Sequence, residues 1–267
     1  DDQYIPPTKT KSGTQMAVIY AIKNHKKIIT EIDQEIYNNT KFKLFHLHGN
    51  AGIGKTRIID EIYKKAINRG IHIFYYRCIK QQKINTSKDF LKKIKETGEF
   101  SNSNSIQEAF QNVLYPFCNY LIIIEDLHNA SDEFIDEIDN LRTLSSTRVP
   151  ISILLTGRDD YTVYNERYFI FCDMLSHKKQ INFSDIEVQP LSDYECISLI
   201  QTIIDDIPEY ILKKIQIASQ NIPFYIIQFI EYMLDTDILY LINRNTVGIS
   251  NITTFNQKIY IPKSVEE

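Results

Sequence analysis

The stretch from Gly49 to Thr56 constrains the fold of this chain more than any other part of its 267 residues. Its sequence, GNAGIGKT, fits the pattern G-x-x-x-x-G-K-[ST]. The preceding segment Lys41–His48 alternates with a period of two, which predicts a strand, and the following segment of about Lys55–Arg69 predicts a helix. A glycine-rich loop between a strand and a helix brings several backbone N–H groups together, and these can hold phosphate oxygens. We therefore predict a phosphate-binding loop, or P-loop.

The residue types in this loop fit phosphate binding. Glycine adopts backbone conformations that other residues adopt only at a cost, so the backbone can approach phosphates closely. The ammonium group of Lys55 is expected to reach the β- and γ-phosphates and to assist catalysis, and the hydroxyl of Thr56 to hold Mg²⁺. The helix that begins there adds its positive dipole end. The predicted nucleotide-binding residues of this segment are Gly49, Asn50, Ala51, Gly52, Ile53, Gly54, Lys55, Thr56 and Arg57.

Two adjacent carboxylates, Glu125 and Asp126, end the apolar run that begins at Tyr120. That run is apolar on both faces, which is typical of a central parallel strand covered by helices. Ligands of open α/β sheets bind at the carboxyl ends of the strands. There, one carboxylate can orient Mg²⁺ through its water shell while the other polarises an attacking water. We predict that Glu125 holds the metal together with Thr56 and that Asp126 activates water; the reverse order stays open.

A third polar group, Arg158, follows the predicted strand Val149–Gly157 toward the same edge of the sheet. A guanidinium there could sense the γ-phosphate or stabilise the charge that develops in phosphoryl transfer, so Arg158 is a candidate catalytic residue. The alternative is a surface arginine paired with Asp159 or Asp160.

Other titratable residues carry weaker signals. His46 and His48 share one face of the predicted strand, but zinc would need further ligands and none is evident, so we interpret both as core or hydrogen-bonded histidines. His128 lies just past the acid pair and could contact that loop or the nucleotide. Three further arginines are interpreted as solvated charges rather than arginine fingers: Arg142, Arg148 and Arg167.

Composition excludes some classes of function. The chain has 30 basic and 34 acidic residues, a net charge of −4, which argues against general affinity for nucleic acid. The longest apolar runs are far shorter than the roughly 20 residues that a membrane helix needs, and no signal peptide is evident. The four cysteines lack metal-ligand spacing and lie mostly in apolar runs, which indicates free thiols in a reducing, cytoplasmic setting.

The order of predicted elements indicates the architecture. Strands alternate with helices up to about Pro190, which favours a doubly wound parallel sheet. Beyond it only helices are expected up to about residue 236: Ser192 and Glu195 have capping-box spacing, and Pro208 and Pro223 can open helices. Short strands follow from Ile238. We predict an α/β fold: a three-layer P-loop NTPase core (1–190) with a parallel sheet, a helical lid (191–236) and a short β-appendage (237–267).

Finer expectations for the core concern its other elements. Ser105 and Glu108 also have capping-box spacing, and Ser131 is expected to cap a helix. The remaining predicted elements are an amphipathic helical stretch over Met16–Tyr37, strands in IHIFYYRC and FSDIEVQP, and helices over Ser87–Glu96 and Ile106–Tyr115.

Two segments carry a family resemblance. HGNAGIGKTRIIDEI and LIIIEDLHNASDE resemble the signal-transduction ATPases with numerous domains, the STAND branch of the AAA+-related P-loop NTPases, and in particular the AAA-16-like modules next to nucleotide cyclases and in large LuxR-type regulators. The matching residues are Gly49–Ile59 and Glu125–Asp132. Asn129 stands where the family usually has Trp, and Ser131 is an insertion. The F-x-GRE phrase usual near the start of such modules is missing, so the resemblance assigns no adenine contacts there.

The resemblance continues toward the C-terminus. VQPLSDYECISLI is similar to the L-x-PLS phrase that opens the family's lid, and SQNIPFYIIQFIEYML to GNPFYLxELVxxL, with Gln220 replacing Gly. The resemblance implies that Pro223 lies beside the nucleotide. IYIPKSVEE resembles the phrase that precedes a winged-helix segment, and the chain begins with Asp1 rather than Met, so we expect a fragment of a longer protein that lacks a following C-terminal domain.

The resemblance implies an ATPase module that binds Mg-ATP, hydrolyses it slowly, and switches conformation with ATP or ADP in a larger cytoplasmic protein. Its expected partners are the other domains of that protein, with self-association as a further expectation, and neither a membrane nor nucleic acid. Three alternatives stay open. They are a sensor that holds ATP or ADP without turnover, a P-loop small-molecule kinase, and an origin-recognition-like DNA loader, against which the net charge argues.

Overall fold

The computed structural model divides the chain into two compact units. One, here called the core unit, comprises residues 28–51 and 55–188; the other, here called the C-terminal unit, comprises residues 189–267 with 1–27 and 52–54. The residues that the structure describes are 23–80, 86–98, 103–112, 118–141, 150–159, 165–177, 182–204, 207–236, 238–241 and 247–249.

The core unit is built on a five-stranded sheet in the order β2-β3-β4-β1-β5. Every neighbouring pair is parallel. The side chains of β3 and β4 are buried along their whole length, as expected of strands covered on both faces. The strands are β1 (Lys43–His48), β2 (His72–Arg77), β3 (Tyr120–Glu125), β4 (Ile151–Thr156) and β5 (Phe183–Glu187).

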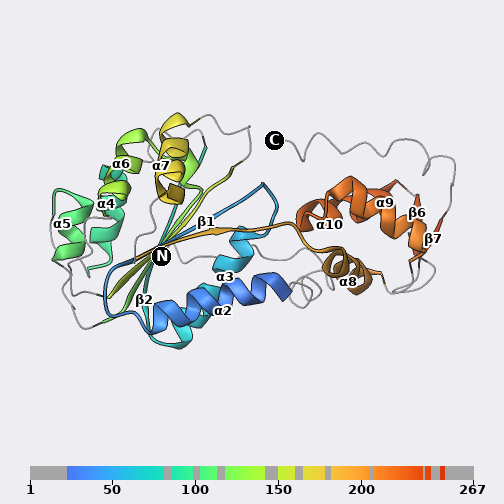
Figure 1. The fold of residues 1–267 in the computed structure, drawn as a ribbon, viewed down its shortest axis with the longest axis horizontal. Coiled ribbons are helices and arrows are strands. Elements are labelled where there is room, and N and C mark those ends of the chain that lie inside the picture. The colour runs from blue at the N-terminus through green and yellow to red at the C-terminus, as the bar shows by residue number, and fades with distance from the viewer. Residues whose placement is uncertain are drawn as a thin grey trace. The chain divides into compact units, whose positions relative to one another are not determined.

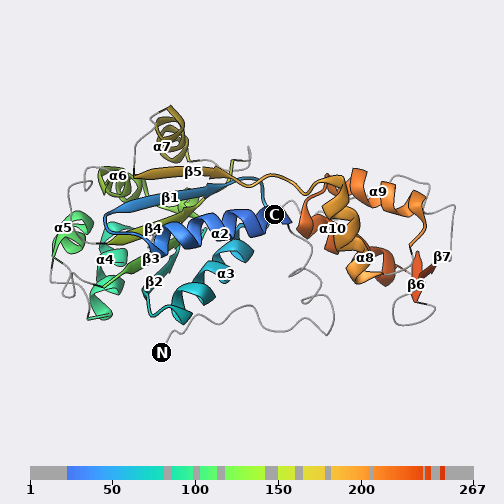
Figure 2. The same ribbon diagram turned by 60° about the horizontal axis from the view of Figure 1, so that its bottom comes forward.

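Helices cover both faces of this sheet and make three layers (Figure 1, Figure 2). One face packs against α4 to α7 in a continuous apolar core that includes Ile122, Ile124 and Leu155. The helices α2 and α3 lie on the opposite face. The bounds are α2 (Lys23–Tyr37), α3 (Lys55–Asn68), α4 (Ser87–Glu96), α5 (Ile106–Gln111), α6 (Asp132–Asn140) and α7 (Glu166–His177).

This strand order positions three loops at one edge. Because all strands are parallel, the P-loop after β1, the acid pair at the end of β3 and the segment after β4 emerge at their carboxyl ends. β4 lies between β1 and β3. Since strands are about 4.8 Å apart, β1 and β3 lie roughly 10 Å apart at this edge, which leaves room for phosphates between them.

In the described part of residues 189–267, the C-terminal unit has three helices and a two-stranded antiparallel ribbon. Ser192 and Glu195 form the predicted capping box, and Pro223 is the first residue of its helix. Apolar side chains of the three helices share one core. The bounds are α8 (Asp193–Ile203), α9 (Glu209–Ser219), α10 (Pro223–Asp235), β6 (Leu239–Leu241) and β7 (Val247–Ile249). No helix in the described ranges is long and apolar enough to cross a membrane.

The predicted α/β fold with a parallel sheet, a helical segment and a short β-appendage is confirmed. Two details differ. The helix α7 was not predicted, because its apolar residues do not follow a clear helical period. Only one of the two hydrogen bonds of the predicted capping box at Ser105 forms. The Ser105 hydroxyl accepts from the Glu108 N–H, but the Glu108 carboxylate accepts from the N–H of Asn104 rather than from that of Ser105.

Candidate functional site

The loop after β1 has the backbone geometry that its glycines allow. Gly52 and Gly54 have φ angles of 72° and 109°, which side-chain-bearing residues rarely adopt. At Gly54 a Cβ atom would also lie 2.7 Å from Cε1 of His25, which is buried. The helix α3 begins at Lys55, so its unpaired N–H groups and positive dipole end lie at the loop.

Lys55 is held over the loop. Its side chain is buried, and Nζ donates to the carbonyl oxygens of Gly49 at 2.6 Å and Asn50 at 2.9 Å. A buried ammonium group with two carbonyl contacts is oriented before any phosphate arrives. The next helical residue with a charged side chain, Arg57, is instead paired along the helix with Glu61 at 2.8 Å.

Glu125 is the more buried member of the acid pair, with 2% of its surface exposed. Oε2 accepts a hydrogen bond from the Tyr75 hydroxyl at 2.6 Å, whereas Oε1 is buried without a hydrogen-bond partner of normal geometry among the described residues. Burial raises the pKa of Glu125, while the Tyr75 hydrogen bond, the charge of Arg77 and the nearby Thr56 hydroxyl oppose that rise. The structure therefore brings the two predicted metal-holding residues, Thr56 and Glu125, together.

Asp126 has a left-handed backbone conformation with φ of 56°. Its N–H donates to the hydroxyl of Thr156 at the end of β4, at 3.1 Å. Its Oδ2 lies 3.0 Å from both Nε and Nη2 of Arg77. A non-glycine residue in this region is uncommon and costs energy, and such residues cluster at functional sites. The turn directs the Asp126 carboxylate away from the strand and toward the end of β2.

Three site residues were missed by the sequence analysis: Asp60, Tyr75 and Arg77. Asp60 lies one turn after Thr56 on α3, is buried, and has an oxygen, Oδ1, without a hydrogen-bond partner among the described residues. Burial and the charge of Glu125 raise its pKa to about 6. The i, i+4 spacing from Thr56 could have indicated Asp60, since such residues share a helix face.

Tyr75 and Arg77 belong to β2, and the register pairs Arg77 with Glu125. Their i, i+2 spacing places both on one face of that strand. The signal in the sequence was therefore present, but its use required knowing that β2 lies beside β3.

The segment after β4 is only partly as predicted. Asp159, one suggested partner of Arg158, is bound to His48 Nδ1 at 2.7 Å. Asp160 lies outside the described residues. Arg158 is half-buried and follows the strand that separates the P-loop from the acid pair. Its role as a γ-phosphate sensor stays a prediction.

The other candidates take structural positions. His128 is buried two residues after Asp126. Asn129 donates to the carbonyl oxygen of Cys78 at 3.3 Å, and Ser131 caps α6 as predicted. Arg167 pairs with Asp136 and Asp139 on α6, which fits a structural charge. Arg142 and Arg148 lie outside the described residues, and all four cysteines are free.

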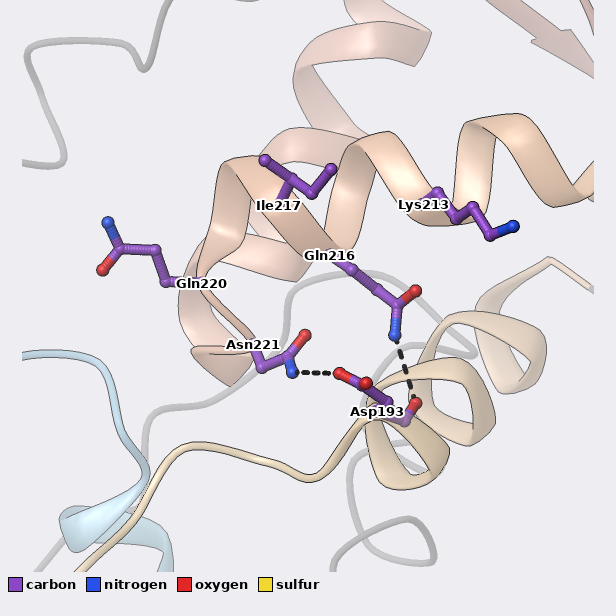
Figure 3. A pocket seen from close by; sticks show the side chains of 6 residues that line it. All are labelled: Asp193, Lys213, Gln216, Ile217, Gln220 and Asn221. Atoms are coloured by element: carbon purple, nitrogen blue, oxygen red, sulfur yellow. Dashed lines mark hydrogen bonds between the residues drawn. The ribbon is translucent and has the colours of Figure 1, made fainter.

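A separate hollow lies within the C-terminal unit (Figure 3). Asn221 Nδ2 donates to Asp193 Oδ1 at 2.9 Å, and Gln216 Nε2 donates to the Asp193 carbonyl oxygen at 3.3 Å (Figure 3). These bonds fix the start of α8 against the end of α9. No predicted nucleotide-binding residue lines this hollow; its lining is Asp193, Lys213, Gln216, Ile217, Gln220 and Asn221.

Comparison with known proteins agrees with this geometry. The model of the NB-ARC domain matches residues 25–190, which is more than half of the chain. The chain belongs to the NB-ARC family. The NB-ARC domain is a STAND-class P-loop ATPase domain, so the resemblance to that class is confirmed. The match spans β1 with its P-loop, the acid pair after β3 and the segment after β4. No curated protein sequence matches the chain.

Solved structures resemble this NB-ARC chain at low identity. A replication initiator DnaA bound to AMPPCP and single-stranded DNA has 13% identity and a TM-score of 0.52, over 86% of this chain and 66% of that one. A DNA replication initiation factor has 13% identity and a TM-score of 0.51, over 86% and 65%. A STAND protein with a tetratricopeptide repeat sensor from Pyrococcus horikoshii has 16% identity and a TM-score of 0.46, over 74% and 28%.

The first two likenesses show the fold of P-loop ATPase domains. This NB-ARC chain spans about two thirds of the two replication proteins and 28% of the STAND protein.

Proposed function

We propose that this NB-ARC chain binds Mg-ATP at the P-loop, hydrolyses it slowly, and acts as a nucleotide-dependent conformational switch in a larger multidomain protein. The observation that carries the proposal is the position of Glu125. A carboxylate that is 2% exposed, with one oxygen lacking a hydrogen-bond partner among the described residues, lies near the first hydroxyl of the P-loop helix. A buried carboxylate with an unsatisfied oxygen is costly unless a cation or a proton compensates it.

The residues present fit a magnesium ion. Oxygen ligands suit Mg²⁺, which keeps most of its waters and is usually held by one or two carboxylates together with substrate phosphates. Thr56 and Glu125 would hold it. When bound, Mg²⁺ would neutralise the charge that develops during phosphoryl transfer. The buried Glu125 oxygen without a hydrogen bond supplies the acceptor that a metal-bound water requires.

Other groups of the chain would bind the phosphates and activate the attacking water. The loop N–H groups and Lys55 bind and orient the phosphates. Asp126 lies beyond Glu125, and its left-handed turn brings its carboxylate to the sheet edge, where it would accept a proton from the attacking water. Arg77 engages Oδ2 of Asp126, so only Oδ1 is available for that task. This pairing supports slow turnover.

The switch role and the partners rest on the family and on the resemblance. By analogy, exchange of ATP for ADP changes the conformation of a STAND module and so signals to neighbouring domains. Pro223, at the start of α10, is the residue through which we expect the helical segment to respond. Arg158 is the expected sensor of the γ-phosphate.

A single-turnover assay with γ-labelled ATP tests the proposal. We expect free phosphate from the unaltered chain, no binding of ATP by Lys55→Ala, and retained binding with slowed phosphate release by Asp126→Asn. Lys64→Ala is the matched control, because Lys64 lies on the same helix and pairs with Glu61 at the surface. Unchanged ATP would indicate a sensor, a labelled acceptor would indicate a kinase, and undiminished binding by Lys55→Ala would refute the P-loop assignment.

A further inference from the structure

A cluster of metal-ligand side chains lies on the core unit, on the sheet face that packs against α7. It comprises His46 and His48 of β1 and Asp185 of the neighbouring strand β5, whose potential ligand atoms all lie within 4.8 Å of one another. Nδ1 of His46 is 2.9 Å from Oδ1 of Asp185, and Nε2 of His48 is 3.3 Å from the same oxygen. Both histidines therefore direct one ring nitrogen at a single carboxylate oxygen.

The other ring nitrogen of each histidine is held by a second group. Nε2 of His46 is 3.1 Å from the hydroxyl of Tyr168, and Nδ1 of His48 is 2.7 Å from Oδ2 of Asp159. The two rings are stacked, with centroids 5.1 Å apart and planes 10° apart. Residues that orient histidine ligands in this way, often carboxylates, are typical of metal sites.

Gly157 makes room for this arrangement. A side chain there would overlap the hydroxyl of Tyr168, so glycine is required where β4 passes α7. His46 is 1% exposed, whereas the side chain of Asp185 is 25% exposed. The cluster is thus built into the fold on one side and open to solvent on the other, which provides a route for an ion.

The contact between His48 and Asp185 requires a positive charge. If the His48 Nδ1–H donates to Asp159, neutral imidazole presents a lone pair at Nε2 to the carboxylate oxygen of Asp185. Two lone pairs 3.3 Å apart repel unless a proton or a metal ion lies between them. The carboxylates of Asp159, Asp185 and Glu187 lie around His48, and their negative charges attract a divalent cation.

The distances are close to those of a tetrahedral zinc site. Ligands about 2.0–2.1 Å from a tetrahedral ion lie about 3.3 Å from one another. The separation of His48 Nε2 and Asp185 Oδ1 is 3.3 Å, and that of His46 Nδ1 and Asp185 Oδ1 is 2.9 Å. The second pair would need to open slightly, and the ligand atoms of the two histidines lie within 4.8 Å of one another. Two imidazoles and one carboxylate suit zinc better than Mg²⁺ or Ca²⁺, which prefer oxygen ligands.

We propose that His46, His48 and Asp185 form a zinc-binding site, with solvent as the fourth ligand and with Asp159 and Tyr168 orienting the two imidazoles. The ion would join β1 to β5 immediately before the P-loop. This inference does not rest on the proposed ATPase function, since the site shares no ligand with it.

Zinc titration of the whole chain, without nucleotide or Mg²⁺, tests the site by calorimetry against a competing chelator. We expect one Zn²⁺ per chain, a loss of more than about 100-fold in affinity for Asp185→Asn, and a loss of about 10–100-fold for Asp159→Asn, the range typical of groups that orient a ligand. Asp173→Asn, an exposed carboxylate of α7, is the control and should bind as the unaltered chain does. Zinc-edge X-ray absorption should show nitrogen and oxygen ligands, two of them imidazoles.

Circular dichroism will verify that each variant is folded; Asp185 lies at the surface, so its substitution should not disturb the core. Equal zinc affinity for the unaltered chain and Asp185→Asn, or sulfur ligands in the absorption spectrum, would overturn the proposal. So would the absence of zinc binding by the folded, unaltered chain.

Discussion

Asp60→Asn is the substitution whose effect on stability follows most directly from the structure. Asp60 is 8% exposed, and burial together with the charge of Glu125 raises its pKa from 3.8 to about 6. A carboxyl group whose pKa is higher in the folded state than in the unfolded state destabilises the fold when it ionises. Protonated Asp60 contributes its full share to the free energy of unfolding below pH 3.8, and this contribution is lost as the pH rises through about 6.

The size of the effect follows from this difference. Each unit of pKa shift corresponds to about 1.36 kcal/mol. A pKa raised by roughly two units therefore means that ionisation of Asp60 lowers the free energy of unfolding by about 3 kcal/mol. Asparagine has nearly the same shape and does not ionise. The difference in free energy of unfolding between Asp60→Asn and the unaltered chain should therefore shift by about 2 kcal/mol, in favour of the variant, between pH 4 and pH 7.5, because the unfolded carboxyl is already more than half ionised at pH 4.

Urea unfolding followed by circular dichroism at several pH values measures this difference. Glu61→Gln is the control: Glu61 is the next residue, is more exposed, and is paired with Arg57 and Lys64, so it should show no comparable gain at high pH. A difference between Asp60→Asn and the unaltered chain that stays constant from pH 4 to 7.5 would refute the argument. So would a variant that becomes relatively less stable as the pH rises.

Three further substitutions address the nucleotide site. Gly54→Ala should reduce stability by about 1–3 kcal/mol and ATP affinity more than tenfold, because alanine is strained at φ of 109° and would contact His25; normal affinity by calorimetry would contradict this. Arg77→Ala should strengthen Mg²⁺ binding in the presence of ADP, because it removes a positive charge beside two carboxylates. Weaker binding in a Mg²⁺ titration would instead indicate that Arg77 contacts the phosphates. Arg158→Ala should reduce the ratio of ATP to ADP affinity in competition binding; an unchanged ratio would make it a surface charge.

The P-loop and the acid pair could be predicted because their evidence is local in the sequence. The glycines at 49, 52 and 54 and the two residues that follow form one continuous pattern, and the strand and helix on either side have clear periods. Glu125 and Asp126 directly follow a buried strand. The two carboxylates also have different environments for a local reason: the strand ends at Glu125, and the chain turns at Asp126.

The rest of the site depends on which strands are neighbours, and periodicity does not determine strand order. Tyr75 and Arg77 act on the acid pair only because β2 lies beside β3. His46 and Asp185 are 139 residues apart in sequence and become partners because β5 pairs with β1. The interpretation of His46 and His48 as core or hydrogen-bonded histidines is confirmed by their contacts. Asp185 was not evident beside them because only residues near them in sequence were considered and not those on the adjoining strands.

The position of β1 between β4 and β5 connects these observations. Its carboxyl end leads directly into the P-loop, while His46 and His48 on one of its faces contact Asp185 of β5 and Asp159, which follows β4. The backbone continues this connection, because the N–H of Val188 donates to the carbonyl oxygen of His48 at 2.8 Å. An ion or a proton in the histidine cluster would therefore act on the strand that carries the phosphate-binding loop without touching the nucleotide. Since the two sites share a strand but no side chain, substitution of Asp185 and substitution of Lys55 perturb them separately, and any effect of one on the other has to pass through β1 or its neighbours.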